Sequence, residues 1–446
     1  MMATAGARTR LAALGALAGV GALVACHRAP DAAARGAAAD ASVGGDAAVG
    51  AIASAPAVVA ARCHSTGRAF VIGDGRALDE LEIGDALATP DGTAVGIVHR
   101  AAAGRVASVA MLATGASEVR LVDLGPTLGD APPPRLAWRG KDVVAGAFGL
   151  STDAREVVVH AVGASARLLF SVPEQRDDSL SFDLAYAGSG GLIVWDEATA
   201  GRAPRGVIRA AAFAGDQRTD PTRDVSPADS DAEAPRVVPA DGGFFVVWIA
   251  RRPEPAASDA AVVEVVGEPR AYAWLESVMV DAHGAATGPV RRLTPDTGHV
   301  SAYDVQALPE GGKPTLLVAA RDDGESVDGS GGALLRVRVR DDGADPPLTF
   351  PSDGLGRGAP TFVDAPAGSG SPGPWLTWIG PKEQLRLLPL DASGAPLAPP
   401  SAEEALDEAR PLLLLARGNA PDGPVSALIA TPSDPAAQLR VFACGR

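Results

Sequence analysis

The chain has 446 residues and a formal net charge of −15. This length exceeds what one compact core usually supports, and the negative charge repels phosphate groups. We therefore expect no nucleic-acid partner and no direct binding to anionic lipid headgroups. The chain contains 52 glycines and 37 prolines, which is high for a globular protein but too few for a wholly disordered one.

Residues 1–26 have the pattern of a secretion signal. Two arginines precede an uncharged apolar stretch from Leu11 to Val24, which is too short for a transmembrane helix. The stretch ends in Leu-Val-Ala-Cys, which resembles the lipobox of bacterial lipoproteins. The resemblance implies a signal peptide over residues 1–25 and an acylated Cys26 that anchors the chain to a membrane. The alternative is an ordinary signal peptide that is cut at a nearby alanine and leaves Cys26 free.

The segment after Cys26 is a tether in this interpretation. Residues 26–62 are rich in Ala, Gly and Asp, contain no aromatic residue and cannot bury enough apolar surface to offset the cost of ordering. Position 27 is His rather than the Asp that resembles an inner-membrane retention signal. We therefore expect an outer-membrane lipoprotein whose folded domain, residues 63–446, is periplasmic or surface-exposed.

The folded domain contains an internal repeat. Seven short apolar runs recur at intervals of about 50 to 70 residues, each followed by a turn and an alternating strand-like segment. Polar turns at 281–284, 340–343 and 391–394 have the Asp and Gly residues of hairpin connections. The runs are TAVGIVHR from Thr93, DVVAGAFG from Asp142, GLIVWDEA from Gly191, FFVVWIAR from Phe244, TLLVAARD from Thr315, PWLTWIGP from Pro374 and VSALIATP from Val425.

The pattern resembles the β-propeller architecture. It predicts an all-β domain of seven four-stranded blades, and tandem β-sandwich domains are the alternative fold. The recurring runs are apolar on consecutive residues, which is typical of strands covered on both faces. Trp195, Trp248 and Trp378 share one register, either as core packing between blades or as a row for ligand stacking. The segment SAEEALDEAR from Ser401 has the only helical pattern.

The two ends of the domain are expected to share one blade. The seventh copy supplies three strands and ends in QLRVFACG, and the segment CHSTGRAFVIG from Cys63 has no blade of its own. Strands from both termini would close the ring, because an open ring leaves an unpaired edge. Adjacent strands would place Cys63 and Cys444 within disulfide reach, and export makes the environment oxidising. The alternative is two reduced, buried cysteines.

The sequence offers little catalytic chemistry. The six histidines form no close pair of metal ligands, and the chain has no GxSxG motif, so we predict no catalytic, cofactor-binding or metal-binding residue. Two acidic loops carry the only pattern that suits a cofactor, a structural calcium ion, although solvated loops are the simpler interpretation. Their carboxylates are Asp229, Asp231 and Glu233 in one loop and Asp322, Asp323, Glu325 and Asp328 in the other.

These features favour a lipid-anchored binding or scaffolding module of the cell envelope, with a protein or glycan partner and a monomeric state. The prediction rests on analogy from the fold. One alternative is an envelope glycan hydrolase or lyase with its site in the funnel of the propeller, which needs two opposed carboxylates. A purely structural lipoprotein is the third.

Overall fold

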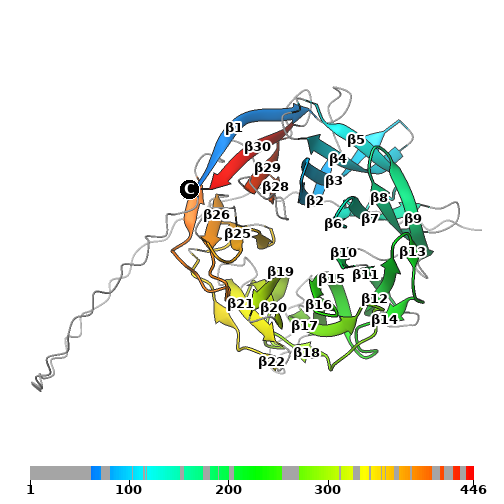
Figure 1. Ribbon diagram of the computed structural model, residues 1–446. Coiled ribbons are helices and arrows are strands. Elements are labelled where there is room, and N and C mark those ends of the chain that lie inside the picture. Colours follow the sequence, from blue (N-terminus) through cyan, green and yellow to red (C-terminus); the bar gives the residue numbers. More distant parts are fainter. Residues whose placement is uncertain are drawn as a thin grey trace, which may run out of the picture. The chain divides into compact units, whose positions relative to one another are not determined.

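A computed structural model shows an all-β domain (Figure 1). The structure describes residues 62–71, 81–403 with short gaps, 412–415, 425–431 and 438–445. The gaps in 81–403 are 103, 114–115, 117, 151–154, 174–180, 189, 200–204, 254–270, 311–312, 325–331, 341–342, 353, 357, 366–370 and 382–383. The predicted signal peptide, Cys26 and the tether up to residue 61 lie outside the described residues, and Arg62, the last residue of the predicted tether, is the first residue of a strand. The compact unit that contains the strands extends from Pro56 to Arg446.

The described strands form seven antiparallel sheets, which we number 1 to 7 along the chain. Sheet 1 is β2 (Glu82–Thr89), β3 (Gly92–Ala101), β4 (Gly104–Ala113) and β5 (Arg120–Pro126). Sheet 2 is β6 (Arg135–Trp138), β7 (Val143–Leu150), β8 (Arg155–Val162) and β9 (Ala166–Pro173). Sheet 3 is β10 (Phe182–Ala187), β11 (Gly190–Ala198), β12 (Gly206–Ala214), β13 (Gln217–Arg218) and β14 (Arg223–Asp224).

The other four sheets continue the series. Sheet 4 is β15 (Asp231–Ala240), β16 (Gly243–Pro253), β17 (Ala271–Asp281) and β18 (Arg291–Arg292). Sheet 5 is β19 (Val300–Glu310), β20 (Lys313–Asp322), β21 (Ala333–Arg340), β22 (Gly343–Ala344) and β23 (Leu348–Thr349). Sheet 6 is β24 (Thr361–Val363), β25 (Trp375–Ile379), β26 (Leu385–Pro389) and β27 (Ser401–Glu403). Sheet 7 is β28 (Leu412–Leu415), β29 (Val425–Thr431), β30 (Gln438–Gly445) and β1 (Arg62–Val71).

The sheets pack in a ring around their first strands (Figure 1). In chain order, β2 contacts β6, β6 contacts β10, β10 contacts β15, β15 contacts β19, and β19 contacts β24. The ring closes through contacts of β1 with β27 and of β28 with β2. Each sheet therefore packs between two neighbours. The predicted β-propeller class is confirmed, and the alternative of tandem sandwiches is wrong.

The seven recurring apolar runs coincide with the second strands of the seven sheets. In sheet 4, β16 has Phe244, Val246 and Trp248 in the core cluster shared with sheet 3. Phe245 and Val247 of the same strand belong to the cluster shared with sheet 5. Both faces of this strand are buried, which explains why its apolar residues are consecutive rather than alternate.

The three tryptophans in the shared register are core residues. Trp195 and Trp248 have no exposed surface, and Trp378 is 4% exposed. At the corresponding place in β7 stands Gly146, where an added Cβ would lie 3.0 Å from Ile193 of the next sheet. The three tryptophans are therefore buried where neighbouring sheets meet, so the core-packing interpretation is confirmed and they form no ligand-stacking row.

Strands from both ends of the domain share sheet 7, as predicted. Its order is β1-β30-β29-β28, with the N-terminal strand on the outer edge next to the C-terminal strand. The register of β1 and β30 places Cys63 directly opposite Cys444. The side chains of these two residues lie outside the described part of the structure.

Of the local features expected from the sequence, the hairpin turns are present and the start of the helix is not. The turn at 281–284 has the expected hairpin form, since Asp281 accepts hydrogen bonds from the backbone NH of His283 and Ala285, and Gly284 has φ of 74°. The turn at 391–394 repeats this arrangement with Asp391 and Gly394. The expected helix from Ser401 is wrong at its start, because Ser401–Glu403 pairs with β26 as strand β27.

Candidate functional site

Three inner-strand aspartates join neighbouring sheets. Asp85 of β2 accepts a hydrogen bond from the backbone NH of Leu136 at 3.1 Å, across the boundary between sheets 1 and 2. The same bond runs from Val237 NH to Asp183 at 2.9 Å and from Phe362 NH to Asp304 at 2.7 Å. We call Asp85, Asp183 and Asp304 the latch aspartates. Asp183 and Asp304 are 5% and 2% exposed, so these carboxylates are engaged in holding the ring together.

Arginines occupy the inner strands between the latch aspartates. Arg135 of β6 lies 3.9 Å from Asp183, and the guanidinium carbon of Arg236 on β15 lies 5.9 Å from the ring centroid of Tyr303. The Tyr303 hydroxyl lies 2.6 Å from the carbonyl oxygen of Ala234 and 2.7 Å from that of Val247. Burial raises the pKa of the Tyr303 phenol well above its usual value, so the hydroxyl stays a donor.

A serine, a histidine and an aspartate meet in sheet 1 without forming a catalytic triad. Ser108 Oγ donates to Asp123 Oδ1 at 2.8 Å and lies 3.0 Å from His99 Nε2. A triad needs the carboxylate on the far nitrogen of the imidazole and a serine that substrate can reach. Here the aspartate binds the serine itself, and Ser108 is completely buried. This network therefore stabilises sheet 1 and offers no nucleophile.

The acidic loops use much of their charge in local contacts. Asp231 accepts a bond from Gly206 NH at 2.8 Å, and Asp323 accepts from Arg321 Nε at 2.6 Å. Asp322 accepts from the backbone NH of His299. Over the described part of the chain, no three His, Cys, Asp or Glu side chains are grouped as metal ligands would be. Glu325 and Asp328 lie outside the described residues, and Asp229 is exposed.

A strained bulge lies where β15 begins. Ala234 has φ of 52°, in the left-handed region that non-glycine residues rarely adopt, and the register of β15 and β16 shifts between Glu233 and Arg236. The Ala234 NH donates to Asp196 Oδ2 at 2.9 Å, and its carbonyl oxygen accepts from Tyr303. Two neighbouring sheets thus fix a conformation that Ala alone would avoid.

Glu233 is the carboxylate that this bulge presents. It pairs with Arg251 and is half-exposed. Burial raises its pKa above the usual value despite the nearby guanidinium, and the charges of Asp196 and Asp231 act in the same direction. A carboxyl group with a raised pKa is the kind of group that can donate a proton. Sequence patterns identified Glu233 only as a member of an acidic loop.

The upper face of the ring is the end of the sheets at which the first strands begin. On this face of sheet 4, Arg252 of β16 covers two half-buried aromatic rings of β17. Its guanidinium carbon lies 5.5 Å from the ring centroid of Tyr272 and 5.6 Å from that of Trp274. Asp296 contacts Arg252 at 3.4 Å and so helps to hold it over the rings. We call Arg252, Tyr272 and Trp274 the aromatic cluster.

Hydrogen bonds and a ring contact hold the aromatic cluster in place. The indole NH of Trp274 donates to Glu276 Oε1 at 3.0 Å, and the buried Trp248 donates to Oε2 of the same carboxylate at 3.2 Å. The Tyr272 ring lies 5.6 Å from the ring of His299. The Arg252 side chain is 47% exposed. Rigid aromatic rings with an accessible cation suit a binding surface, because they supply contact area at little entropic cost.

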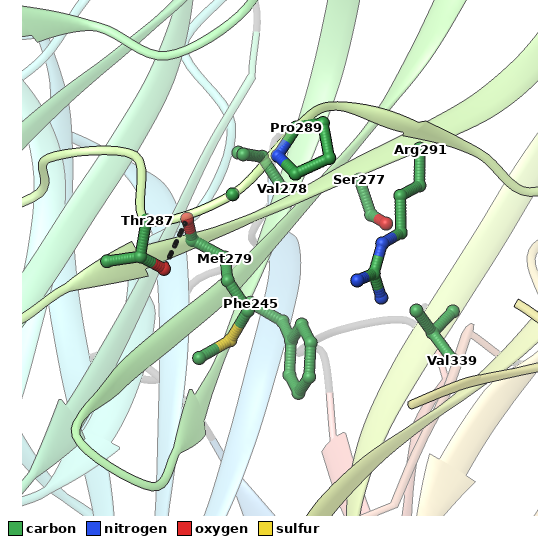
Figure 2. Close-up of a pocket in the computed structure, with 9 residues that line it drawn as sticks. Phe245, Ser277, Val278, Met279, Thr287, Pro289, Arg291 and Val339 are labelled. Carbon is green, nitrogen blue, oxygen red and sulfur yellow. Dashed lines mark hydrogen bonds between the residues drawn. The ribbon is translucent and has the colours of Figure 1, made fainter. Parts of the chain in front are cut away.

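A pocket lies between sheets 4 and 5 (Figure 2). This pocket has a volume of about 200 Å³. Its lining is mainly apolar, with Phe245, Met279 and Val339, and Arg291 reaches toward Val339 (Figure 2). Arg291 donates to the carbonyl oxygen of Arg340 on the next sheet. The pocket is smaller than most small-molecule sites, and its one cation already joins two sheets.

Comparisons with known proteins identify similar folds only. No protein family and no curated protein matches the chain. An α-L-arabinanase from Penicillium chrysogenum, solved with arabinobiose, is 10% identical over 76% of this chain and 100% of its own, with a TM-score of 0.45. Hydrazine synthase from Kuenenia stuttgartiensis is 12% identical over 80% of this chain and 94% of its own, also with a TM-score of 0.45. Such likeness does not bear on function.

One further property concerns membranes. Within the described residues, no helix has the length and apolar character required to cross a membrane.

Proposed function

We propose that this protein is an exported, lipid-anchored propeller that binds a protein or glycan partner in the cell envelope through its aromatic cluster. The observation that carries the proposal is the placement of Arg252 over Tyr272 and Trp274 on the upper face. Tyr, Trp and Arg are the residue types enriched where proteins bind partners strongly. The CH face of a sugar ring or an apolar side chain of a protein would pack on such a surface.

The anchoring part of the proposal rests on the lipobox-like sequence that ends at Cys26. Acylation of Cys26 after cleavage would hold the chain at the outer membrane. Two or three acyl chains make anchoring effectively permanent, since each buried methylene contributes about 0.8 kcal/mol. The propeller would then present its loops to partners near the membrane.

The carboxylates of the inner strands already accept structural hydrogen bonds, which favours binding over catalysis. The latch aspartates accept backbone hydrogen bonds from the next sheet, and two of them are buried. A hydrolase of the kind considered from sequence needs two accessible, opposed carboxylates. Asp183 and Asp304 cannot serve that purpose without leaving backbone NH groups unpaired.

A pull-down tests the proposal. The tagged lipoprotein is crosslinked in its own envelope, solubilised in mild detergent, and recovered together with its partner. We expect the double variant Arg252→Ser/Tyr272→Ser to lose at least about tenfold in partner recovery, because both residues lie on the proposed surface. Leu348→Ser is the matched control, since Leu348 is a 52% exposed apolar residue on sheet 5. Equal recovery by all three proteins would contradict the assignment of the surface.

A glycan hydrolase is the second candidate, and Glu233 is the observation that favours it. Its raised pKa suits a general acid. Screening envelope polysaccharides for cleavage, with Glu233→Gln beside the wild type, tests this candidate. Turnover by the wild type that falls at least about a hundredfold in the variant would replace the binding proposal with an enzymatic one. Absence of cleavage would leave binding as the function.

A further inference from the structure

The two cysteines of the folded domain meet at the point where the ring closes. Sheets 1 to 6 are each built from strands that are consecutive in the chain, whereas sheet 7 joins β1 to β30. The register of this pair runs from Arg62 opposite Gly445 to Val71 opposite Gln438 and places Cys63 opposite Cys444. Among the described sheets, this seam is the place where strands from the two ends of the domain pair.

The register suits a disulfide bond. Directly opposite residues of antiparallel strands have Cα atoms about 4.5 or 5.5 Å apart, depending on whether the pair is hydrogen-bonded. Both separations fall within the range of about 4.4 to 6.8 Å observed in disulfides. Residues in such pairs also share one face of the sheet. The chain contains three cysteines, and acylation would consume Cys26, so Cys63 and Cys444 are each other's only intramolecular partners.

We propose that a disulfide between Cys63 and Cys444 locks the closing sheet of the propeller in the exported protein. The bond forms when the two thiols lose two protons and two electrons to a disulfide-bearing thiol oxidoreductase of the exported compartment. The thiolate of one cysteine attacks that disulfide, and the second cysteine displaces the oxidoreductase from the mixed disulfide. The oxidoreductase leaves as a dithiol.

The bond would have a specific consequence for the ring. The sequence separation of its two cysteines covers nearly the whole domain, so the bond constrains the unfolded chain strongly. Separation of β1 from β30 would no longer open the ring while the bond is intact. This inference rests on the export that belongs to the proposed function, because a reducing compartment would keep both thiols free.

Peptide mapping of the wild-type lipoprotein tests the bond directly. Protein isolated from its membrane is denatured with N-ethylmaleimide and without reductant, digested and analysed by mass spectrometry. We expect one crosslinked pair of peptides that contains Cys63 and Cys444, with neither cysteine alkylated. The variant Cys444→Ser should show Cys63 fully alkylated. Alkylation of both cysteines in the wild type would overturn the proposal for the protein in the cell.

A second measurement separates geometry from compartment. The purified reduced protein is incubated with a mixture of oxidised and reduced glutathione, and its melting temperature is compared with and without reductant. We expect the bond to form and to raise the melting temperature by about 6 °C, while Cys63→Ser/Cys444→Ser shows no change with reductant. Failure of the bond to form here would overturn the inferred juxtaposition. If the bond forms in the glutathione mixture but the protein isolated from cells has free thiols, the result would instead contradict export. The pull-down test of partner binding does not depend on this outcome.

Discussion

Burial of His160 on β8 makes the fold sensitive to acid. It is 7% exposed, and its Nδ1 atom is buried without a hydrogen-bond partner in the described structure. Burial lowers the pKa of His160 from 6.5 to about 4. Between these two values the unfolded chain binds a proton that the folded protein does not. The free energy of unfolding therefore falls as the pH decreases through this range, and His160 has no effect above about pH 7.5.

Replacing His160 with Leu should remove this sensitivity. We expect His160→Leu to resemble the wild type at about pH 7.5 and to exceed its stability by about 2.5 kcal/mol at about pH 4.5, since Leu cannot be protonated. Urea unfolding at both pH values measures the difference. His283→Gln is the control. Because the His283 side chain is 64% exposed, this variant should keep the pH dependence of the wild type. Equal pH dependence in wild type and His160→Leu would show that His160 is not responsible.

Ala234 carries backbone strain that a single substitution can relieve. Its φ of 52° costs an L-residue about 1 to 2 kcal/mol, whereas Gly adopts it freely. We expect Ala234→Gly to stabilise the protein by about 1 kcal/mol in urea unfolding. Ala307→Gly, within β19, should destabilise by about 0.5 to 1 kcal/mol, because Gly weakens an ordinary strand. Destabilisation by both variants would mean that the methyl group of Ala234 contributes more through packing than its backbone costs.

At the scale of the elements, the latch aspartates determine how firmly neighbouring first strands are joined. Removing the Asp304 carboxylate leaves the buried Phe362 NH without its acceptor, which costs about 2 to 3 kcal/mol. The same change at the half-buried Asp85 allows water to reach Leu136 NH and should cost about 1 kcal/mol. Denaturant unfolding of Asp304→Ala and Asp85→Ala measures both losses. The reverse order would contradict a role set by burial.

The sequence predicted elements that repeat and missed contacts that cross between sheets. The second strands were identifiable because burial on both faces produces consecutive apolar residues, such as Phe244 to Ile249 in β16. Asp183 and its partner Val237 are 54 residues apart, and the acceptor binds a backbone NH that any residue except proline could supply. The only signal was an aspartate inside three alternate first strands, β2, β10 and β19, each directly before an apolar residue.

The candidate site was predicted less well for a related reason. Arg252 and Tyr272 come together because β16 and β17 pair in a register that places them opposite each other. The loop between them in the sequence gives no indication of that register. Ser401–Glu403 shows the opposite error: local helix propensity is strong there, yet the open edge of β26 pairs with it as a strand.

At the scale of the whole molecule, strand β1 makes one of the two contacts that close the ring. β1 covers the outer edge of β30 in sheet 7, and it contacts β27 of sheet 6. Deleting residues 62–71 would leave the backbone groups on that edge of β30 unpaired and would weaken the boundary between sheets 6 and 7. An unpaired edge strand is a template for pairing with another chain.

We therefore expect the deletion of residues 62–71 to lower the melting temperature by at least about 5 °C and to cause concentration-dependent self-association. The comparison is made in reductant, so that a bond between Cys63 and Cys444 does not contribute. Light scattering after size-exclusion chromatography measures the association. Deletion of residues 40–49, an equal length of the Ala-rich and Gly-rich tether, is the control and should change neither property. If the shortened domain stayed monomeric with an unchanged melting temperature, β1 would be dispensable, and the ring would close through the contacts of β28 with β2.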